Sequence, residues 1–102
     1  MWILQSLSDD PEPAPQTFRL LPGAIKTVGR APRADFILDA ALVSRVHCRL
    51  TAADDHLEVE DLKSTNGIFV NDKRVDRAQL ADGDRLRVGR VELTVGRATT
   101  EG

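Results

Sequence analysis

The segment LVSRVHCRL, residues 42–50, places a serine, an arginine, a histidine and a cysteine close together among aliphatic residues near the middle of the chain: Ser44, Arg45, His47 and Cys48. Three kinds of site use such residues. They are a nucleophile beside its general base, a set of metal ligands, and a loop that binds an anion before the chain enters a strand. Composition and the order of the motifs distinguish among the three.

Catalytic and metal sites both lack necessary parts. Ser44, His47 and an acid such as Asp61 contain the residue types of a hydrolytic triad, but the sequence has no nucleophile elbow and no glycine-rich oxyanion loop. Zinc needs about four ligands, whereas His47, Cys48 and His56 make three, and the first two are expected on opposite faces of a strand. We therefore predict no enzyme, no cofactor and no metal, and keep a small hydrolase as the less favoured alternative.

Length and charge restrict the possible partners. A chain of 102 residues with 41% hydrophobic residues is long enough for one core and too short for two. The formal charge of −2, from 14 basic and 16 acidic residues, gives no overall field for nucleic acid or an anionic membrane. Any anion site must be local, and we expect a monomeric domain without direct nucleic-acid or membrane partners.

The compartment is inferred from cysteine usage and from hydropathy. The single cysteine, Cys48, excludes an internal disulfide and suggests no oxidising compartment. No apolar run approaches the roughly 18 residues of a spanning helix, and the first ten residues lack a basic signal-peptide region. These observations predict an intracellular protein.

Hydrophobic residues recur with a period of two. Leu57 and Val59 alternate with acidic residues, and residues 85–88 and 91–95 alternate on both sides of the two-residue turn Gly89-Arg90. Turn signals recur about every 8 to 12 residues, which indicates a β-sandwich or barrel.

Two other segments are not typical of strands. Residues 8–16 are acidic and proline-rich, so we expect a solvated loop between a strand that starts at Trp2 and a strand over 17–21. Residues 76–83, DRAQLADG, could form only a helical turn.

Polar residues that are unusual for strands gather at three loops: Gly29-Arg30, Ser44-Arg45 with His47, and Lys63 to Gly67. Loops at one end of an antiparallel sandwich converge although they are distant in sequence. Together they offer two guanidinium groups, one ammonium and three hydroxyls. A phosphate fits this set best, because its oxygens accept several charge-assisted hydrogen bonds at once.

The ordered motifs VGR, SRVH and KSTNGIFVN resemble the forkhead-associated (FHA) domain, and the resemblance extends over about the whole chain, including LADGDRLRVG and VELTV. It implies an antiparallel β-sandwich of about eleven strands with binding loops at one end, over residues 1–97, followed by a tail or linker start at 98–102. It also implies phosphothreonine-dependent binding to partner proteins, as in a signalling adaptor. The stretches MWIL and FRLLPG are similar, more narrowly, to the N-terminal FHA domain of nibrin, a DNA double-strand-break repair adaptor. That likeness would imply a nuclear location, and otherwise we expect a cytoplasmic one.

The resemblance also implies roles for single residues. Arg30, Ser44 and Thr65 would contact the phosphate, and Arg45 would add a charged or backbone contact. Asn66 would hold the peptide main chain beside the phosphothreonine.

The remaining matched positions lie at the rim or support the loops. Lys63 would stand at the rim of the site, as a peptide contact. Val46, Cys48 and Leu50 would form the inward face of the following strand. Architectural roles are implied at four positions: Gly29, His47, Gly67 and Asn71.

Ordinary explanations remain open for these residues. Arg30 could be a solvated arginine at a strand end, and Asn66-Gly67 is a common hairpin signal even in proteins that bind nothing. A third class of function is an adaptor that packs through a sheet face and ignores phosphate. The sequence alone favours the phosphothreonine reader because the three motifs occur together and in order.

Overall fold

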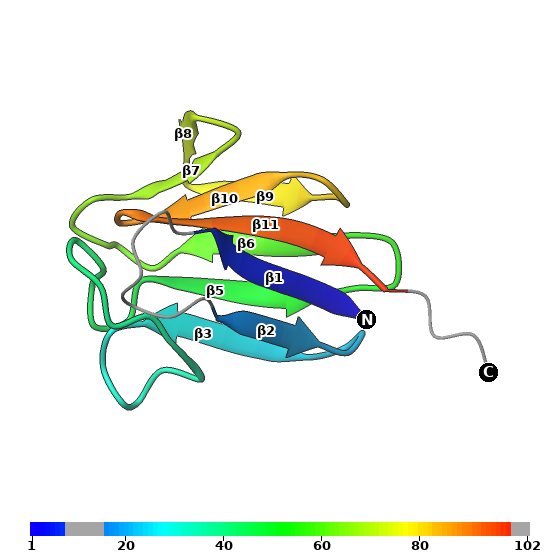
Figure 1. Cartoon of the computed structure of the whole chain (residues 1–102), viewed down its shortest axis with the longest axis horizontal. Helices are drawn as coiled ribbons and strands as arrows, with labels where there is room; N and C mark the ends of the chain where they lie inside the picture. Colours follow the sequence, from blue (N-terminus) through cyan, green and yellow to red (C-terminus); the bar gives the residue numbers. More distant parts are fainter. Residues whose placement is uncertain (8–15, 99–102) are drawn as a thin grey trace.

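The computed structural model describes residues 1–7 and 16–98, which form eleven strands and no helix. The strands make two sheets that pack face to face as the layers of a sandwich (Figure 1). This confirms the predicted all-β sandwich. The described residues contain no helix that is long and apolar enough to cross a membrane.

The first sheet has six strands, paired throughout in the antiparallel sense. Its order is β2 (Thr17–Leu20), β1 (Trp2–Leu7), β11 (Val91–Arg97), β10 (Arg85–Val88), β7 (Ile68–Val70) and β8 (Lys73–Val75). The predicted turn at Gly89-Arg90 connects β10 to β11, with Val88 opposite Val91. The predicted strand at 17–21 is confirmed as β2, whereas residues 8–15 of the predicted loop, like residues 99–102 of the predicted tail, lie outside the described residues.

The second sheet has five strands, in the order β4 (Phe36–Ile37), β3 (Ile25–Gly29), β5 (Cys48–Ala52), β6 (Leu57–Asp61) and β9 (Arg77–Leu80). One pair departs from the antiparallel expectation, because β3 and β4 run parallel. The loop between them folds back on β3, where an Asp35 carboxylate oxygen accepts hydrogen bonds from the backbone N–H and hydroxyl of Thr27, at 2.9 and 3.1 Å. These bonds lower the pKa of the Asp35 carboxyl. They also hold the end of the loop beside Thr27, so that β4 starts next to β3 and runs parallel to it.

The segment DRAQLADG does not form a helical turn. Arg77 to Leu80 make strand β9, in which Leu80 pairs with Leu57 and Ala78 pairs with Val59 of β6. Residues 77–80 alternate between polar and apolar side chains, and pairing with β6 uses this period of two. Sheet formation therefore overrides the weak local preference for a turn of helix.

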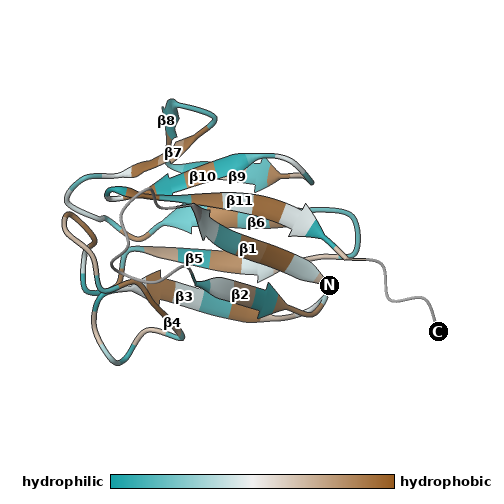
Figure 2. Ribbon diagram, in the orientation of Figure 1, coloured by the Kyte–Doolittle hydropathy of each residue, from teal (hydrophilic) through white to brown (hydrophobic). Residues whose placement is uncertain are grey.

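The core fills the space between the sheets. Leu57 and Val59 are buried and their acidic neighbours are not, as the alternation predicts. In Figure 2 the strands change between hydrophobic (brown) and hydrophilic (teal) segments along their length. Phe18 of the first sheet stacks on Phe36 of the second with ring centroids 4.6 Å apart. Trp2 is buried and donates its indole N–H to the Ala53 carbonyl at 2.8 Å. Burial of these large side chains joins the two layers.

Several connections between strands lie together at one end of the sandwich (Figure 1). Strands β3, β6 and β10 end there, and β5, β7 and β11 begin there, opposite the N-terminus (Figure 1). The three polar loops predicted from the sequence therefore lie at the same end.

A charged row crosses the outer face of the second sheet. Glu60 of β6 bonds Arg49 of β5 on one side and Arg77 of β9 on the other, and Arg77 also lies 3.7 Å from Glu58. The hydrogen bond from Arg77, with the positive charges of Arg77 and Arg49, lowers the pKa of Glu60. These exposed pairs connect three neighbouring strands.

We expect Glu60→Gln to lower the melting temperature at about pH 7, and we expect this effect to disappear as the pH falls through the lowered folded-state pKa of Glu60. A carboxylate whose folded-state pKa is depressed contributes stability above its ordinary pKa of about 4.3 and loses it as the pH falls through the folded value. Melting curves across this range measure the effect, and Arg77→Gln should give the same profile. A destabilisation that stays constant with pH would contradict the role of the ionised carboxylate.

Candidate functional site

One open pocket at the loop end collects every residue that was predicted to touch a ligand. Its volume is about 450 Å³, and none of the residues that line it is acidic. The predicted ligand contacts in the lining are Arg30, Ser44, Arg45, Lys63, Thr65 and Asn66. Leu42, Val43 and Val46 complete it. Three segments far apart in the sequence thus meet in one place.

Close backbone packing joins the first two loops. The Arg30 N–H donates to the Ser44 carbonyl at 2.9 Å, and the Ala31 N–H donates to the Arg45 carbonyl at 3.0 Å. A Cβ atom at Gly29 would lie 2.1 Å from the Arg45 carbonyl oxygen, a distance that excludes any side chain. Glycine at this position is therefore required for Arg30 to lie beside Ser44.

His47 holds the second and third loops together. Its imidazole is fully buried, and its Nδ1 accepts a hydrogen bond from the Ser44 N–H at 3.0 Å. Nδ1 must then be unprotonated, so Nε2 carries the proton and donates to the Gly67 carbonyl at 2.8 Å. The His47 N–H donates to the Val28 carbonyl at 2.7 Å, and the His47 carbonyl accepts from the Leu62 N–H at 3.0 Å. A neutral histidine thus fixes both loops, and this geometry fits its predicted architectural role.

Ser64 stabilises the third loop, and sequence reasoning missed it. Its hydroxyl accepts a hydrogen bond from the Gly67 N–H at 2.9 Å and donates to the Asp61 carboxylate. Gly67 has a φ of 77°, which glycine adopts without strain. Serine three residues before a glycine is a familiar turn-capping pattern, and this was the available signal.

The third loop is also bonded to the second. The Thr65 N–H donates to the Ser44 hydroxyl oxygen at 3.1 Å, and the Asn66 side-chain NH₂ donates to the Leu42 carbonyl at 3.0 Å. Asn66-Gly67 is therefore no hairpin turn, since it lies in the connection from β6 in one sheet to β7 in the other. Leu42 has a φ of 69° and leaves 51% of its surface exposed at the pocket. Nothing in the sequence indicated this conformation for a leucine.

Of the predicted supporting residues, Val46 lies elsewhere than expected. Strand β5 begins at Cys48, so Val46 precedes it and is half-buried in the pocket wall; only Cys48 and Leu50 form the inward face. Asn71 occupies the turn between β7 and β8, where its side-chain oxygen accepts from the Arg85 N–H at 3.0 Å. It supports that turn and does not line the pocket.

The contacts do not form a hydrolytic triad. Both nitrogens of His47 are occupied by backbone groups, the Ser44 hydroxyl accepts from Thr65, and Asp61 bonds Ser64. Burial raises the pKa of the Cys48 thiol to about 12, which leaves it protonated and unreactive. No cluster of three potential metal ligands occurs within residues 1–7 and 16–98.

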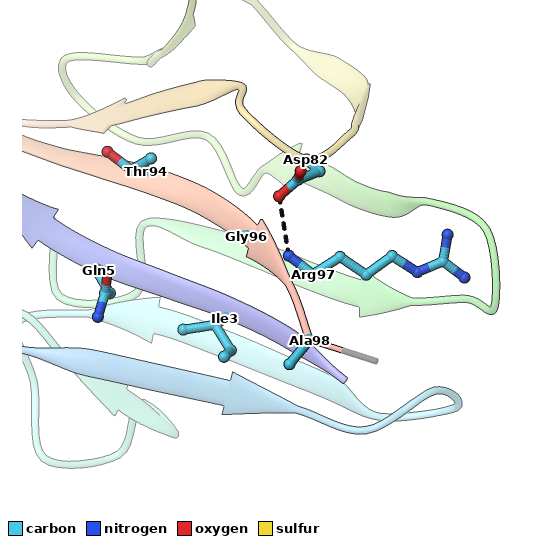
Figure 3. A pocket seen from close by; sticks show the side chains of 7 residues that line it. All are labelled: Ile3, Gln5, Asp82, Thr94, Gly96, Arg97 and Ala98. Carbon is cyan, nitrogen blue, oxygen red and sulfur yellow. Dashed lines mark hydrogen bonds between the residues drawn. The ribbon is translucent and has the colours of Figure 1, made fainter. Parts of the chain in front are cut away.

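A second hollow lies on the outer face of the first sheet (Figure 3). Its lining consists of Ile3, Gln5, Asp82, Thr94, Gly96, Arg97 and Ala98, around about 220 Å³. Its one carboxylate accepts from the Arg97 N–H at 3.1 Å, and the Arg97 guanidinium lies over the Trp2 ring. No predicted site residue lies there, and the hollow lacks the cationic character of the first pocket.

Comparison with known proteins gives a consistent result. The family model of the FHA domain matches residues 26–89. GarA, a glycogen accumulation regulator of Mycobacterium tuberculosis, is 40% identical over 74 residues, which cover 72% of this chain and 46% of GarA. The ABC transporter ATP-binding/permease protein Rv1747 of the same organism is 39% identical over 87 residues, 85% of this chain and 10% of Rv1747. The chain thus spans less than half of these curated relatives.

Solved structures agree with the sequence matches. A structure from a study of phosphothreonine-dependent FHA domain interactions superposes with a TM-score of 0.83 at 33% identity, covering 97% of this chain and 98% of that one. The narrower likeness to nibrin finds no support, since the relatives named above are mycobacterial. The matched region includes all three loop motifs, and the chain belongs to the FHA domain family.

Proposed function

We propose that this chain is a phosphothreonine-dependent interaction module that binds phosphorylated segments of partner proteins without chemical turnover. One observation supports this most strongly: all six residues expected to touch a ligand line a single pocket without carboxylates. The relative solved in the study of phosphothreonine-dependent interactions supports the same function.

The phosphate would bind among donors that are already oriented. Because the Ser44 hydroxyl oxygen accepts from the Thr65 N–H, its own proton is free to donate to a phosphate oxygen. The guanidinium groups of Arg30 and Arg45 would supply charge-assisted bonds, for which their planar geometry is well suited. Such preorganisation reduces the entropy that binding must overcome.

The peptide main chain would bind beside the phosphate. The Asn66 NH₂ is bonded to the Leu42 carbonyl, and this bond fixes the plane of the amide. Its carbonyl oxygen and second N–H remain available for an extended peptide. Asn66 would thus orient the segment that carries the phosphothreonine.

The alternatives carry less support. An adaptor that binds independently of phosphate would not require three cations in one pocket. A hydrolase would require a histidine with a free ring nitrogen, whereas both ring nitrogens of His47 are hydrogen-bonded to the backbone. An intracellular, monomeric domain, with a boundary near residue 97, remains our prediction from the sequence. The DNA-repair role that the nibrin likeness implied stays outside this proposal.

The first test compares one peptide in phosphothreonine, Asp, Glu and unmodified forms. We expect only the phosphothreonine form to bind well, because phosphate carries about −1.5 to −2 charges on three acceptor oxygens and a carboxylate carries one charge on two oxygens. Isothermal calorimetry measures all four affinities. Equal affinities would disprove the phosphate proposal and favour the phosphate-independent adaptor.

Phosphothreonine should bind more tightly than phosphoserine. Leu42, Val43 and Val46 give the pocket an apolar part that can take the threonine methyl group. Burial of one methyl contributes about 0.8 kcal/mol, or roughly a fourfold difference in affinity. Competition between matched peptides checks this ratio, and equal binding would show that the methyl group stays in solvent.

Arg30→Ala and His47→Ala should fail in different ways. Arg30 is exposed at the pocket, so its loss should weaken phosphopeptide binding about tenfold or more and leave the melting temperature almost unchanged. Loss of buried His47 leaves the Ser44 N–H and Gly67 carbonyl without partners, which should cost about 1–3 kcal/mol of stability and weaken binding as well.

Melting curves with and without a phosphothreonine peptide distinguish the two roles. If Arg30→Ala unfolded much earlier while His47→Ala stayed stable and failed to bind, the roles would be reversed. Arg33→Ala is a matched control, because Arg33 is exposed in the same loop and does not line the pocket.

A further inference from the structure

Lys63 has a backbone conformation that lysine rarely adopts. Its φ is 56°, in the left-handed region that normally favours glycine or asparagine. Bonds on both sides hold it there: the Leu62 N–H donates to the His47 carbonyl at 3.0 Å, and the Ser64 hydroxyl is bonded to Gly67 and Asp61. Conformational strain of this kind persists where the surroundings enforce it, often at binding sites. The constrained backbone places an exposed lysine in the pocket lining.

The pocket has more positive charge than one phosphate needs. Arg30, Arg45 and Lys63 contribute three cations, and no carboxylate lines the pocket. None of the three forms an ion pair among the residues that the structure describes. A phosphothreonine carries about −1.5 to −2 charges at neutral pH. Its phosphate would be balanced by the two arginines, and the charge of Lys63 would remain unmatched.

We propose that Lys63 binds a second anionic group on the partner, close in sequence to the phosphothreonine. This inference rests on the proposed phosphothreonine function and adds the class of sequence selected. Lys63 precedes Thr65 and Asn66 in one loop, and an extended peptide advances about 3.3 Å per residue. The second group therefore lies within a few residues of the phosphothreonine, as an acidic side chain or as a second phosphate.

The test uses one phosphothreonine peptide with three kinds of neighbour. The first has neutral neighbours, the second carries Glu at each nearby position in turn, and the third carries a second phosphorylated residue there. Each is titrated into the wild-type chain, Lys63→Gln and Lys73→Gln. Lys73 is an equivalent exposed lysine on the edge strand β8, outside the pocket, so its variant removes the same formal charge.

We expect at least one Glu peptide to bind the wild type about two- to fivefold more tightly than the neutral peptide, the scale of an exposed ion pair. A second phosphate should give an equal or larger preference. Lys63→Gln should bring both ratios close to one, and this loss of the ratio is the readout whatever the variant does to the affinity for the neutral phosphopeptide. Lys73→Gln should keep the preference, and added salt should reduce it in the wild type.

Each contrary result has a definite meaning. Equal binding of all phosphopeptides by the wild type, or the same loss in Lys63→Gln and Lys73→Gln, overturns the second anion site and leaves the phosphothreonine function intact. A preference for the second phosphate alone supports the site and identifies phosphate as its ligand. Failure of every phosphopeptide to bind the wild type overturns the proposed function itself.

Discussion

The binding end of this domain depends on a neutral histidine buried between two loops. His47 accepts from one loop through Nδ1 and donates to the other through Nε2, so a single side chain sets the distance between Ser44 and Gly67. The bond to the Gly67 carbonyl is buried and the bond from the Ser44 N–H is partly buried, so loss of the imidazole would leave polar groups unpaired at sites with little or no access to water. The histidine therefore shapes the pocket although it is absent from its lining.

The sandwich supplies the rigid frame for these loops. Strands β3, β5 and β6 are neighbours in one sheet, and the chain then crosses to β7 in the other sheet. The crossing segment, residues 62–67, belongs to no strand, and the hydroxyls of Ser44 and Ser64 accept from its Thr65 and Gly67 N–H groups. These bonds replace a sheet ladder and fix the third loop against the second.

The same arrangement favours recognition over catalysis. Groups that a hydrolase would keep reactive are here used to hold backbone atoms, while the exposed groups are cations and hydroxyls. Cations gathered without carboxylates repel one another in the free domain, and an anionic partner relieves that repulsion. The arrangement gives a physical reason for binding that depends on phosphate and that should respond to nearby charge.

The sequence by itself determined the sandwich, most of its strands and the loops that carry the predicted ligand contacts, because alternation and turn residues are local signals. It misjudged residues 77–80, where pairing with β6 decides the structure, and the position of Val46 relative to β5. It also missed Ser64, the left-handed Leu42 and Lys63, and the parallel pair of β3 with β4. Only the tertiary structure decided these features, because they depend on contacts between segments that are distant in the chain. Local periodicity carries no information about such contacts.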